Sequence, residues 1–514
     1  MLRVIAGIGA LQVAVTLVNM LRSKAVAILL GPEGVGVIGL VDQLVQLVLY
    51  VSTLSLPFAA VRFLSRAHSE GHAAFAQSFG SFLRALLMLT TIGAIIGGGL
   101  AVFRPDLLGQ QLSDYRTFLI PALVGVPAMA LHGLFSNVLA AARRTRAAAL
   151  MAMVIALTLS GATVIGILLD GVRGFYWGAL IANVLIAVGV AVYLRRSLNL
   201  LLFGRDHGVR QELRKNPDIL PFAFWFYGGS LAYSFAFFVA RYAVLSNFGA
   251  AEAGRLQVGI ALYTALNLVL GPANGLYLTP ILNRRIPLVE KFAAALEFQR
   301  KQWLVILLLA MGMVLFAHLA VVVLFSTAFL SVAGVVALFV IAQTIYQLAA
   351  VLQALIIGLD DLRLYGTTAV VGHLALAGLA WVLAPSLGIM GVGIAFLVSA
   401  ILHVAMTFSR LRLHFGMMLS RRHVVAVVYG IGALALAALL TSSLDPWQPQ
   451  GIAVRILAYV AFAVSLLALL EGRELRQLVV RGQSVWFPQG TERVPRMGGA
   501  TYRRLTRRFF PEVW

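Results

Sequence analysis

The chain has 514 residues, of which 61% are hydrophobic and only 11% are charged, whereas soluble domains carry about 25% charged residues. Apolar runs of about 20 residues, long enough to cross a bilayer as helices, recur along the chain. This composition excludes an ordinary soluble domain and predicts a multi-pass membrane protein. The absence of cysteine excludes disulfides and thiolate metal sites. The net charge of +21 is typical of nucleic-acid-binding proteins, but the basic residues flank the apolar runs, which argues against nucleic acid as a partner.

Fourteen apolar segments are expected to be membrane-spanning helices, so we predict an all-α polytopic fold. In chain order they cover roughly residues 4–30, 35–60, 79–103, 117–142, 147–169, 174–194, 219–246, 253–281, 303–326, 329–358, 366–385, 388–408, 424–441 and 452–471.

Two stretches in different halves of the chain predict an internal repeat. "LRSKAVAILLGPEGVG" begins at residue 21, and "ARYAVLSNFGAAEAG" begins at residue 240. The copies match at two glycines and one arginine, namely Gly31 with Gly249, Gly36 with Gly254, and Arg22 within one residue of Arg241. Six spans separate the copies, and because this number is even the halves share an orientation and are related by an axis along the membrane normal.

We therefore predict two six-helix lobes related by a pseudo-twofold axis, followed by two extra C-terminal helices. The expected divisions are an N-lobe over 1–196, a cytoplasmic linker over 197–218, a C-lobe over 219–412, the last two spans over 413–471 and a basic cytoplasmic tail over 472–514.

The basic residues predict the orientation of the chain. If the N-terminus is cytoplasmic, 32 of the 40 Lys and Arg lie on the cytoplasmic side and four lie on the other side. Basic residues concentrate in cytoplasmic loops, so we expect both termini to be cytoplasmic. The outer loops are all short, and there is no HExxH, nucleophile-elbow or carboxylate-pair motif. We therefore expect a transporter with no catalytic residues and no metal site.

Several spans carry a narrow polar stripe, which must face protein or a water-filled cavity because lipid excludes it. At 100° per residue, Asn19 lies near Arg22 on span one, and Tyr227 and Ser234 lie on the same side as Arg241 on span seven. For the uncharged residues, a role in holding helices together is an equal alternative.

Arg22 and Arg241 occupy matching places in the two lobes, and no acidic residue lies in the same helical turn. Two cations that face one cavity from opposite lobes would bind an anion, and the planar donor fork of arginine suits phosphate. Arg62, just after span two, is either a topology signal or a guard at the cytoplasmic mouth. The substrate-binding residues expected from these patterns are Arg22, Arg241, Arg62, Asn19, Gln46, Tyr227, Ser234 and Asn267.

Asp42 is the only acidic residue well inside a span. It can bind a coupling proton or cation, or it can pair with one of the lobe arginines, and the sequence leaves both roles open. No cofactor is expected, and any coupling would be to a proton or sodium gradient.

The string K-x6-GPEGVG-x6-Q, from Lys24 to Gln43, resembles the start of O-antigen and related polysaccharide-lipid translocases of the multidrug/oligosaccharidyl-lipid/polysaccharide exporter (MOP) superfamily. The resemblance implies a flippase for undecaprenyl-pyrophosphate-linked oligosaccharide, with two lobes that alternate access around a cationic central cavity. It also implies that Lys24 binds substrate. The chain departs from the group in having fourteen expected spans, where many members have twelve, and in the segment "FAAVRFLSR" after span two, which lacks the usual glycines.

Two alternatives remain open. A cation-coupled multidrug antiporter of the same fold would need acidic residues in the cavity, and the chain offers only Asp42. A membrane polysaccharide polymerase or glycosyltransferase would need a larger outer loop. The tail holds nine Arg against three Glu, which favours binding to anionic inner-leaflet lipids over docking on a partner protein such as the polysaccharide polymerase or chain-length machinery.

Overall fold

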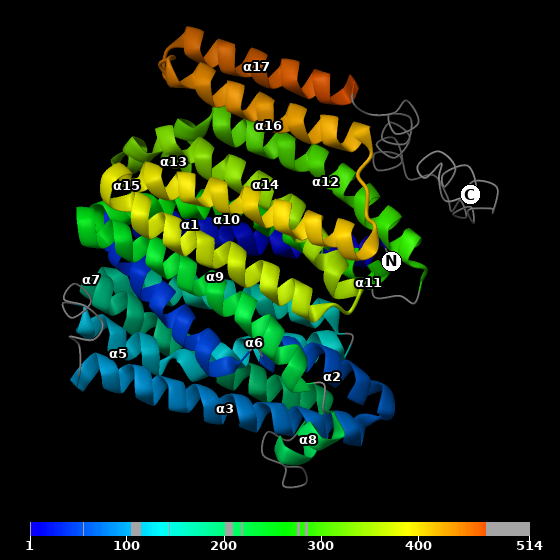
Figure 1. Ribbon diagram of the computed structural model, residues 1–514. Coiled ribbons are helices and arrows are strands. Elements are labelled where there is room, and N and C mark those ends of the chain that lie inside the picture. Colours follow the sequence, from blue (N-terminus) through cyan, green and yellow to red (C-terminus); the bar gives the residue numbers. More distant parts are fainter. Residues whose placement is uncertain are drawn as a thin grey trace.

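In the computed structural model, the described residues are 2–54, 56–103, 115–142, 144–200, 209–216, 219–274, 278–282 and 286–468. They form helices joined by short turns and contain no β-strand (Figure 1). The predicted all-α fold is confirmed. The tail expected over 472–514 lies outside the described residues.

The first lobe occupies the lower part of Figure 1. Its helices are α1 (Leu2–Thr53), α2 (Leu56–Glu70), α3 (His72–Phe103), α5 (Arg116–Val124), α6 (Val126–Ala141) and α7 (Thr145–Leu198). The short helix α8 (Val209–Lys215) belongs to the expected linker. The buried carboxylate of Glu212 on α8 accepts hydrogen bonds from Ser78 of α3 at 3.1 Å and from Asn216 at 2.9 Å, so this part of the linker is fixed to the first lobe.

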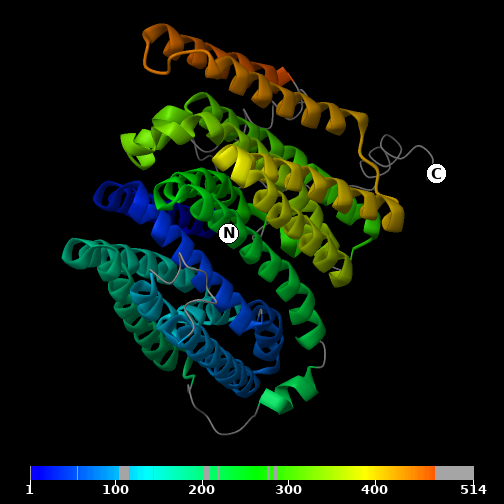
Figure 2. The same cartoon turned by 60° about the vertical axis from the view of Figure 1, so that its left-hand side comes forward.

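The second lobe lies above the first in Figure 1. Its elements are α9 (Ile219–Phe248), α10 (Ala250–Ala273), α11 (Thr279–Leu282), α12 (Leu288–Leu315), α13 (Ala317–Leu324), the 3-10 helix η3 (Thr327–Val332), α14 (Ala333–Gly358) and α15 (Leu362–Phe415). The last two helices, α16 (Arg421–Ser442) and α17 (Pro449–Ala468), pack on the side of this lobe that faces away from the first lobe, as Figure 2 also shows.

Three of the long helices contain a sharp turn that divides each of them into two spans. Gly31 in α1, Gly171 in α7 and Gly388 in α15 have φ values of 63°, 55° and 58°. Glycine adopts positive φ without the clash that a Cβ atom would cause, which explains why these reversals fall at glycine. Together with Gly249, where φ is 84°, these residues mark one end of the helix bundle, which we call the glycine-turn end.

The fourteen expected spans all have helical counterparts. Within the described part of the chain, ten helices are long and apolar enough to cross a membrane, and α1, α7 and α15 each count as two when divided at their glycine. With α10 the number reaches the expected fourteen. Several expected boundaries were wrong. The largest difference is at α12, which begins at Leu288 rather than near 303 because its first turns are amphipathic, and span two ends at Thr53 rather than near 60, where a separate amphipathic helix, α2, follows. In addition, α3 begins at His72 rather than near 79, α10 ends at Ala273 rather than near 281, and α15 ends at Phe415 rather than near 408.

The two lobes meet at a reciprocal glycine contact near the glycine-turn end. A Cβ atom on Gly36 of α1 would collide with the carbonyl oxygen of Ala250 in α10, and a Cβ atom on Gly254 would collide with the carbonyl oxygen of Pro32. The two contacts are equivalent in the repeat, because at an offset of 218 positions Gly36 matches Gly254 and Pro32 matches Ala250. Such a reciprocal pair of contacts is expected where a pseudo-twofold axis passes between the two helices.

Arg455 of α17 holds the hairpin formed by the last two helices. The side chain is 2% exposed, and its guanidinium donates to the carbonyl oxygens of Leu444 at 2.9 Å, Gly451 at 3.1 Å, and Thr441 and Asp445 at 3.3 Å. Two of these carbonyls lie at or just beyond the end of α16, where a helix leaves carbonyl groups without partners. Arg455, which the sequence placed inside or at the edge of a span, therefore has a structural role.

Replacing Arg455 by glutamine is expected to lower the free energy of unfolding by about 2–3 kcal/mol, because hydrogen bonds from a charged donor are lost and buried carbonyls stay unpaired. Heat unfolding in detergent micelles, followed by intrinsic fluorescence, measures the change. Arg412→Gln is the matched control, since Arg412 is exposed near the end of α15. Equal melting temperatures for the two variants would contradict this role.

Candidate functional site

Arg241 of α9 lies buried where the two lobes meet, with 6% of its surface exposed. Its Nε donates to Oε1 of Gln257 in α10 at 2.9 Å, and its Nη1 donates to Oε1 of Gln43 in α1 at 2.9 Å. Nη1 also donates to the carbonyl oxygen of Phe237 at 3.2 Å. A cation of the second lobe is thus held by an amide of the first lobe.

Both the oxygen and the nitrogen of the Gln43 amide form hydrogen bonds. While Oε1 accepts from Arg241, Nε2 donates to the carbonyl oxygen and to the hydroxyl of Ser234 in α9, both at 3.0 Å. Ser234, one of the residues singled out from the sequence, is therefore part of the same contact between α1 and α9. Separating the lobes at this level would break three hydrogen bonds of one side chain.

Asp42 lies next to Gln43 on α1 and interacts electrostatically with both predicted arginines, Arg22 and Arg241. Its Oδ1 accepts a hydrogen bond from the hydroxyl of Tyr176 in α7 at 3.1 Å. The guanidinium carbon of Arg22 lies 5.1 Å from the centre of the Phe175 ring, within the range of a cation–π interaction. The two arginines and the carboxylate together carry a net charge of +1.

We call this set the inter-lobe cluster. Its members are Arg22, Asp42, Gln43, Tyr176, Ser234, Arg241 and Gln257. Three of them, Gln43, Tyr176 and Gln257, were not among the site residues predicted from the sequence. Gln43 closes the motif quoted above, and Gln257 is the repeat equivalent of Gly39, whose Cβ would lie 3.0 Å from the Gln257 side chain. No sequence signal marks Tyr176.

Lys24 contacts the second lobe at a different place. Its Nζ donates to the carbonyl oxygen of Val323, in the last turn of α13, at 2.8 Å. A cation at the C-terminal end of a helix is favoured by the helix dipole and by the free carbonyl groups there. Lys24 therefore joins α1 to α13 and does not reach the atoms that hold Arg241.

The remaining predicted residues lie outside the inter-lobe cluster. Asn267 is exposed and accepts a hydrogen bond from Nε2 of Gln347 at 3.1 Å. Asn19 is exposed and Gln46 and Tyr227 are half-buried, and none of the three donates or accepts a side-chain hydrogen bond with another described residue. Arg62 is in α2, and its side chain lies outside the described residues.

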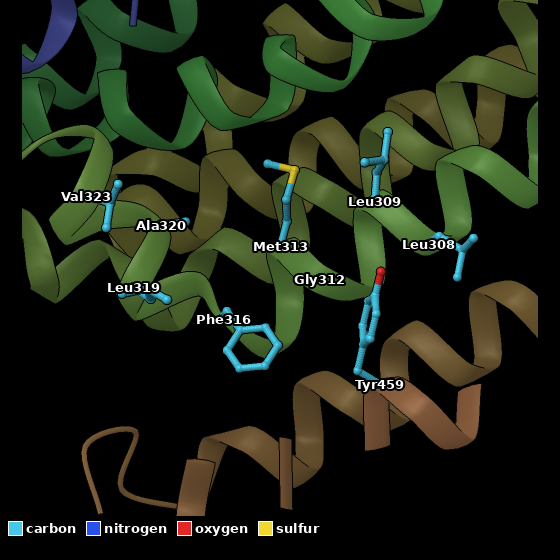
Figure 3. Close-up of a pocket in the computed structure, with 9 residues that line it drawn as sticks. All are labelled: Leu308, Leu309, Gly312, Met313, Phe316, Leu319, Ala320, Val323 and Tyr459. Atoms are coloured by element: carbon cyan, nitrogen blue, oxygen red, sulfur yellow. The ribbon is translucent and has the colours of Figure 1, made fainter. Parts of the chain in front are cut away.

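An apolar groove of about 380 Å³ lies between α12, α13 and α17. Figure 3 shows that Tyr459 of α17 reaches across it toward α12. Val323, whose carbonyl oxygen accepts from Lys24, lines one end of the groove. The groove is thus apolar along its walls and has a cation beside one end. Its lining residues are Leu308, Leu309, Gly312, Met313, Phe316, Leu319, Ala320, Val323 and Tyr459.

No protein-family model matches the sequence, and no curated protein sequence matches it. The fold, in contrast, is similar to that of solved membrane transporters. It matches the lipid II flippase MurJ in an inward closed conformation with a TM-score of 0.68 and 11% identity, over 89% of this chain and 98% of that chain.

The fold also matches a multidrug resistance transporter of the MATE family, part of the MOP superfamily. The inward-facing conformation gives a TM-score of 0.61 at 16% identity, over 79% of this chain and 98% of that chain. The outward-facing conformation gives 0.57 at 16% identity, over 84% and 96%. The chain therefore has the two-lobed fold of these membrane transporters, and its long apolar helices make it a multi-pass membrane protein.

Proposed function

We propose that the protein is a flippase for an undecaprenyl-pyrophosphate-linked oligosaccharide, the repeat unit of O-antigen in lipopolysaccharide or of a related surface polysaccharide. The observation that carries the proposal is the placement of Arg22 and Arg241, which come from opposite lobes and both interact electrostatically with Asp42. The net charge of +1 at this place favours an anion, and arginine binds phosphate oxygens in pairs.

The hydrogen bonds suggest how substrate would enter the cycle. With the lobes in contact, Gln43 occupies one donor of Arg241. When the lobes part, that donor is released, and a pyrophosphate oxygen can take the place of the Gln43 oxygen. The freed amide of Gln43 can then bind a sugar hydroxyl, while Gln257, in the same lobe as Arg241, keeps its hydrogen bond to Nε. Alternating access follows, because the cluster closes again only when the anion has left.

The groove beside α17 supports a lipid-linked substrate. A polyprenyl chain needs an apolar surface, and the groove offers one within reach of the cation at Lys24. We propose that the two C-terminal helices shield part of the lipid tail while the head group crosses. This gives Lys24 a role near the phosphate end of the tail, which is consistent with the role that the sequence resemblance implies for it.

A multidrug antiporter is the second candidate, and the similarity to the MATE transporter favours it. Such a protein would bind cationic drugs at an acidic site. In the inter-lobe cluster the only carboxylate is Asp42, which lies beside two arginines. The charge balance therefore supports the flippase proposal over the antiporter.

Reconstitution tests the proposed function directly. Purified protein in proteoliposomes is expected to move undecaprenyl-pyrophosphate carrying a short fluorescent oligosaccharide between leaflets, measured as the fraction protected from an added membrane-impermeant quencher. Protein-free vesicles are the control. If the lipid-linked sugar stays in one leaflet while an ethidium-type cation is exported, the antiporter is the function.

The proposed setting is the bacterial inner membrane, with both termini in the cytoplasm. The charge distribution supports this orientation, and it places the glycine-turn end on the periplasmic side. We further propose that the tail binds anionic inner-leaflet lipids, with the polysaccharide polymerase and chain-length machinery as a protein partner, and that Asp42 carries the coupling to a proton or sodium gradient.

A further inference from the structure

Two histidines that are 30 positions apart in the sequence meet in the core of the second lobe. His373 lies in the first half of α15 and His403 in the second half, and they are 6% and 0% exposed. Their ring centres are 5.4 Å apart with an interplanar angle of 72°. Ser399 donates to the carbonyl oxygen of Gly372 at 2.8 Å, which ties the two halves of the helix together beside the pair.

His403 is held by one hydrogen bond and has one ring nitrogen without a partner. Its Nε2 lies 2.5 Å from Nε2 of Gln353 in α14, and because an amide nitrogen has no lone pair to share, the amide donates to the ring. The neutral ring then carries its hydrogen on Nδ1, for which the described residues offer no acceptor. A glycine at 372 is needed here, since a Cβ atom would lie 2.5 Å from this Nδ1.

Among the described residues, the surroundings of the pair are polar and no charged group is in direct contact with either ring. Tyr233 of α9 meets His373 with ring centres 5.2 Å apart, and Tyr346 of α14 meets His403 at 5.3 Å. Beyond this layer, the titratable or charged groups that interact with these two tyrosines are Tyr50 of α1, Tyr263 of α10, Tyr365 of α15 and Arg241 of α9. Other buried oxygens nearby on α14 and α15, those of Gln343, Gln347 and Thr407, also lack partners among the described residues.

A continuous set of contacts joins the histidines to the inter-lobe cluster. The ring of Tyr233 packs on His373 and also on Phe237, with ring centres 4.4 Å apart in the second case. The guanidinium of Arg241 lies over the Phe237 ring at 5.7 Å and donates to the Phe237 carbonyl oxygen. Movement of His373 would therefore shift the rings of Tyr233 and Phe237 in α9. Through them it would displace Arg241, which binds Gln43.

We propose that His373 and His403 form a proton-binding site in the second lobe, and that protonation of this site weakens the contact between the lobes. A proton that binds His403 enters at Nε2, because Nδ1 already carries a hydrogen; the Gln353 amide then turns its oxygen toward the ring, and the unpaired Nδ1–H donates to a hydrating water. Neighbouring imidazoles titrate as a pair, so the site takes up about one proton. The use of this site rests on the proposed transport function. A proton that is taken up on one side of the membrane and released on the other would drive the movement of the lobes.

The test measures the lobe contact without any substrate. Because the chain has no cysteine, Asp170→Cys and Ser386→Cys place one spin label on each lobe at the glycine-turn end, where both residues are exposed. In lipid nanodiscs, the distance distribution is expected to shift toward separated lobes as the pH falls from about 8 to about 4, a range that extends below the one in which an exposed histidine titrates. His373→Asn and His403→Asn are each expected to abolish the shift, whereas His414→Asn, which alters an exposed histidine, retains it.

A shift that persists unchanged in both histidine variants overturns the proposal, and so does a shift that follows sodium at constant pH. If a histidine variant does not elute as a single species, Gln353→Leu replaces it, and this variant is expected to move the midpoint of the shift while leaving both rings in place. The proton count provides a second readout: titration of the purified protein should give about one proton fewer for the double histidine variant. If the shift depends on protons but the protein moves no lipid-linked sugar, the proposed substrate is wrong while the proton-binding site stands.

Discussion

Replacing Arg241 by glutamine is expected to reduce flipping of the lipid-linked oligosaccharide by at least about tenfold. The change removes the donors that bind Gln43 and Gln257, and it lowers the charge of the cluster from a net +1 to zero. A hydrogen bond from a charged donor is worth about 1.5–3 kcal/mol, and 1.4 kcal/mol corresponds to a factor of ten. The proteoliposome assay measures the initial rate.

Two companion variants show which property of Arg241 matters. Arg241→Lys keeps the charge but not the planar fork, so it should recover only part of the rate. Arg255→Gln is the matched control, because Arg255 is a partly exposed arginine of α10 that pairs with Glu252. If Arg241→Gln moves substrate as fast as Arg255→Gln does, the arginine has no part in transport, and the anion site must be sought elsewhere.

Replacing Gly36 by alanine is expected to shift the population away from the conformation described here. The added methyl group would overlap the carbonyl oxygen of Ala250 across the lobe contact, and backbone atoms cannot yield as a flexible side chain can. Overpacking costs about 1–3 kcal/mol, which is enough to change the ratio of closed to separated lobes by about fivefold to more than a hundredfold. The spin-label pair at Asp170 and Ser386 reads this as a longer distance between the lobes.

Gly99→Ala is the control, since a Cβ atom at Gly99 in α3 would meet nothing within 4 Å. Gly254→Ala should act like Gly36→Ala, because the contacts of the two glycines are reciprocal. The double variant should show less than the sum of the single effects, as expected for residues that share one contact. An unchanged distance distribution in Gly36→Ala would mean that the lobes do not separate at this contact.

The fold could be predicted from the sequence because membrane-spanning helices are recognised by their long apolar runs. The sequence also predicted the symmetry, since Gly31 and Gly249 repeat where each lobe must turn the chain with positive φ. The start of α12 was missed because its first turns are amphipathic and look like a loop on a hydropathy scale. The end of span two was placed too late because the first residues of the amphipathic helix α2, LPFAAV, are apolar and follow α1 directly in the sequence.

The candidate site was predicted only in part, for reasons of geometry. The internal repeat placed Arg22 and Arg241 in matching positions, helical projection placed polar residues beside them, and the structure shows that both arginines interact with Asp42. Projection says which side a residue occupies, but it does not say which partner faces it. Gln257 and the pair of His373 and His403 depend on how helices pack, so their roles could not be inferred from one sequence.

For Asp42, the structure favours one of the two roles that the sequence left open. The sequence left it as either a coupling residue or a partner of the arginines. Its hydrogen bond to Tyr176 and its interaction with both arginines favour the pairing, although the same carboxylate remains our proposed coupling residue in the first lobe. The two roles are compatible if substrate phosphate displaces the carboxylate from an arginine during transport.

Deleting the gene in the organism that encodes it tests the central claim most directly, with the lipid-linked intermediates of the inner membrane identified by mass spectrometry. The flippase account predicts that one undecaprenyl-pyrophosphate oligosaccharide accumulates, and that Arg22→Gln and Arg241→Gln alleles fail to clear it. An unchanged pool of lipid-linked sugars, together with new sensitivity to cationic drugs, would contradict the account and establish the antiporter.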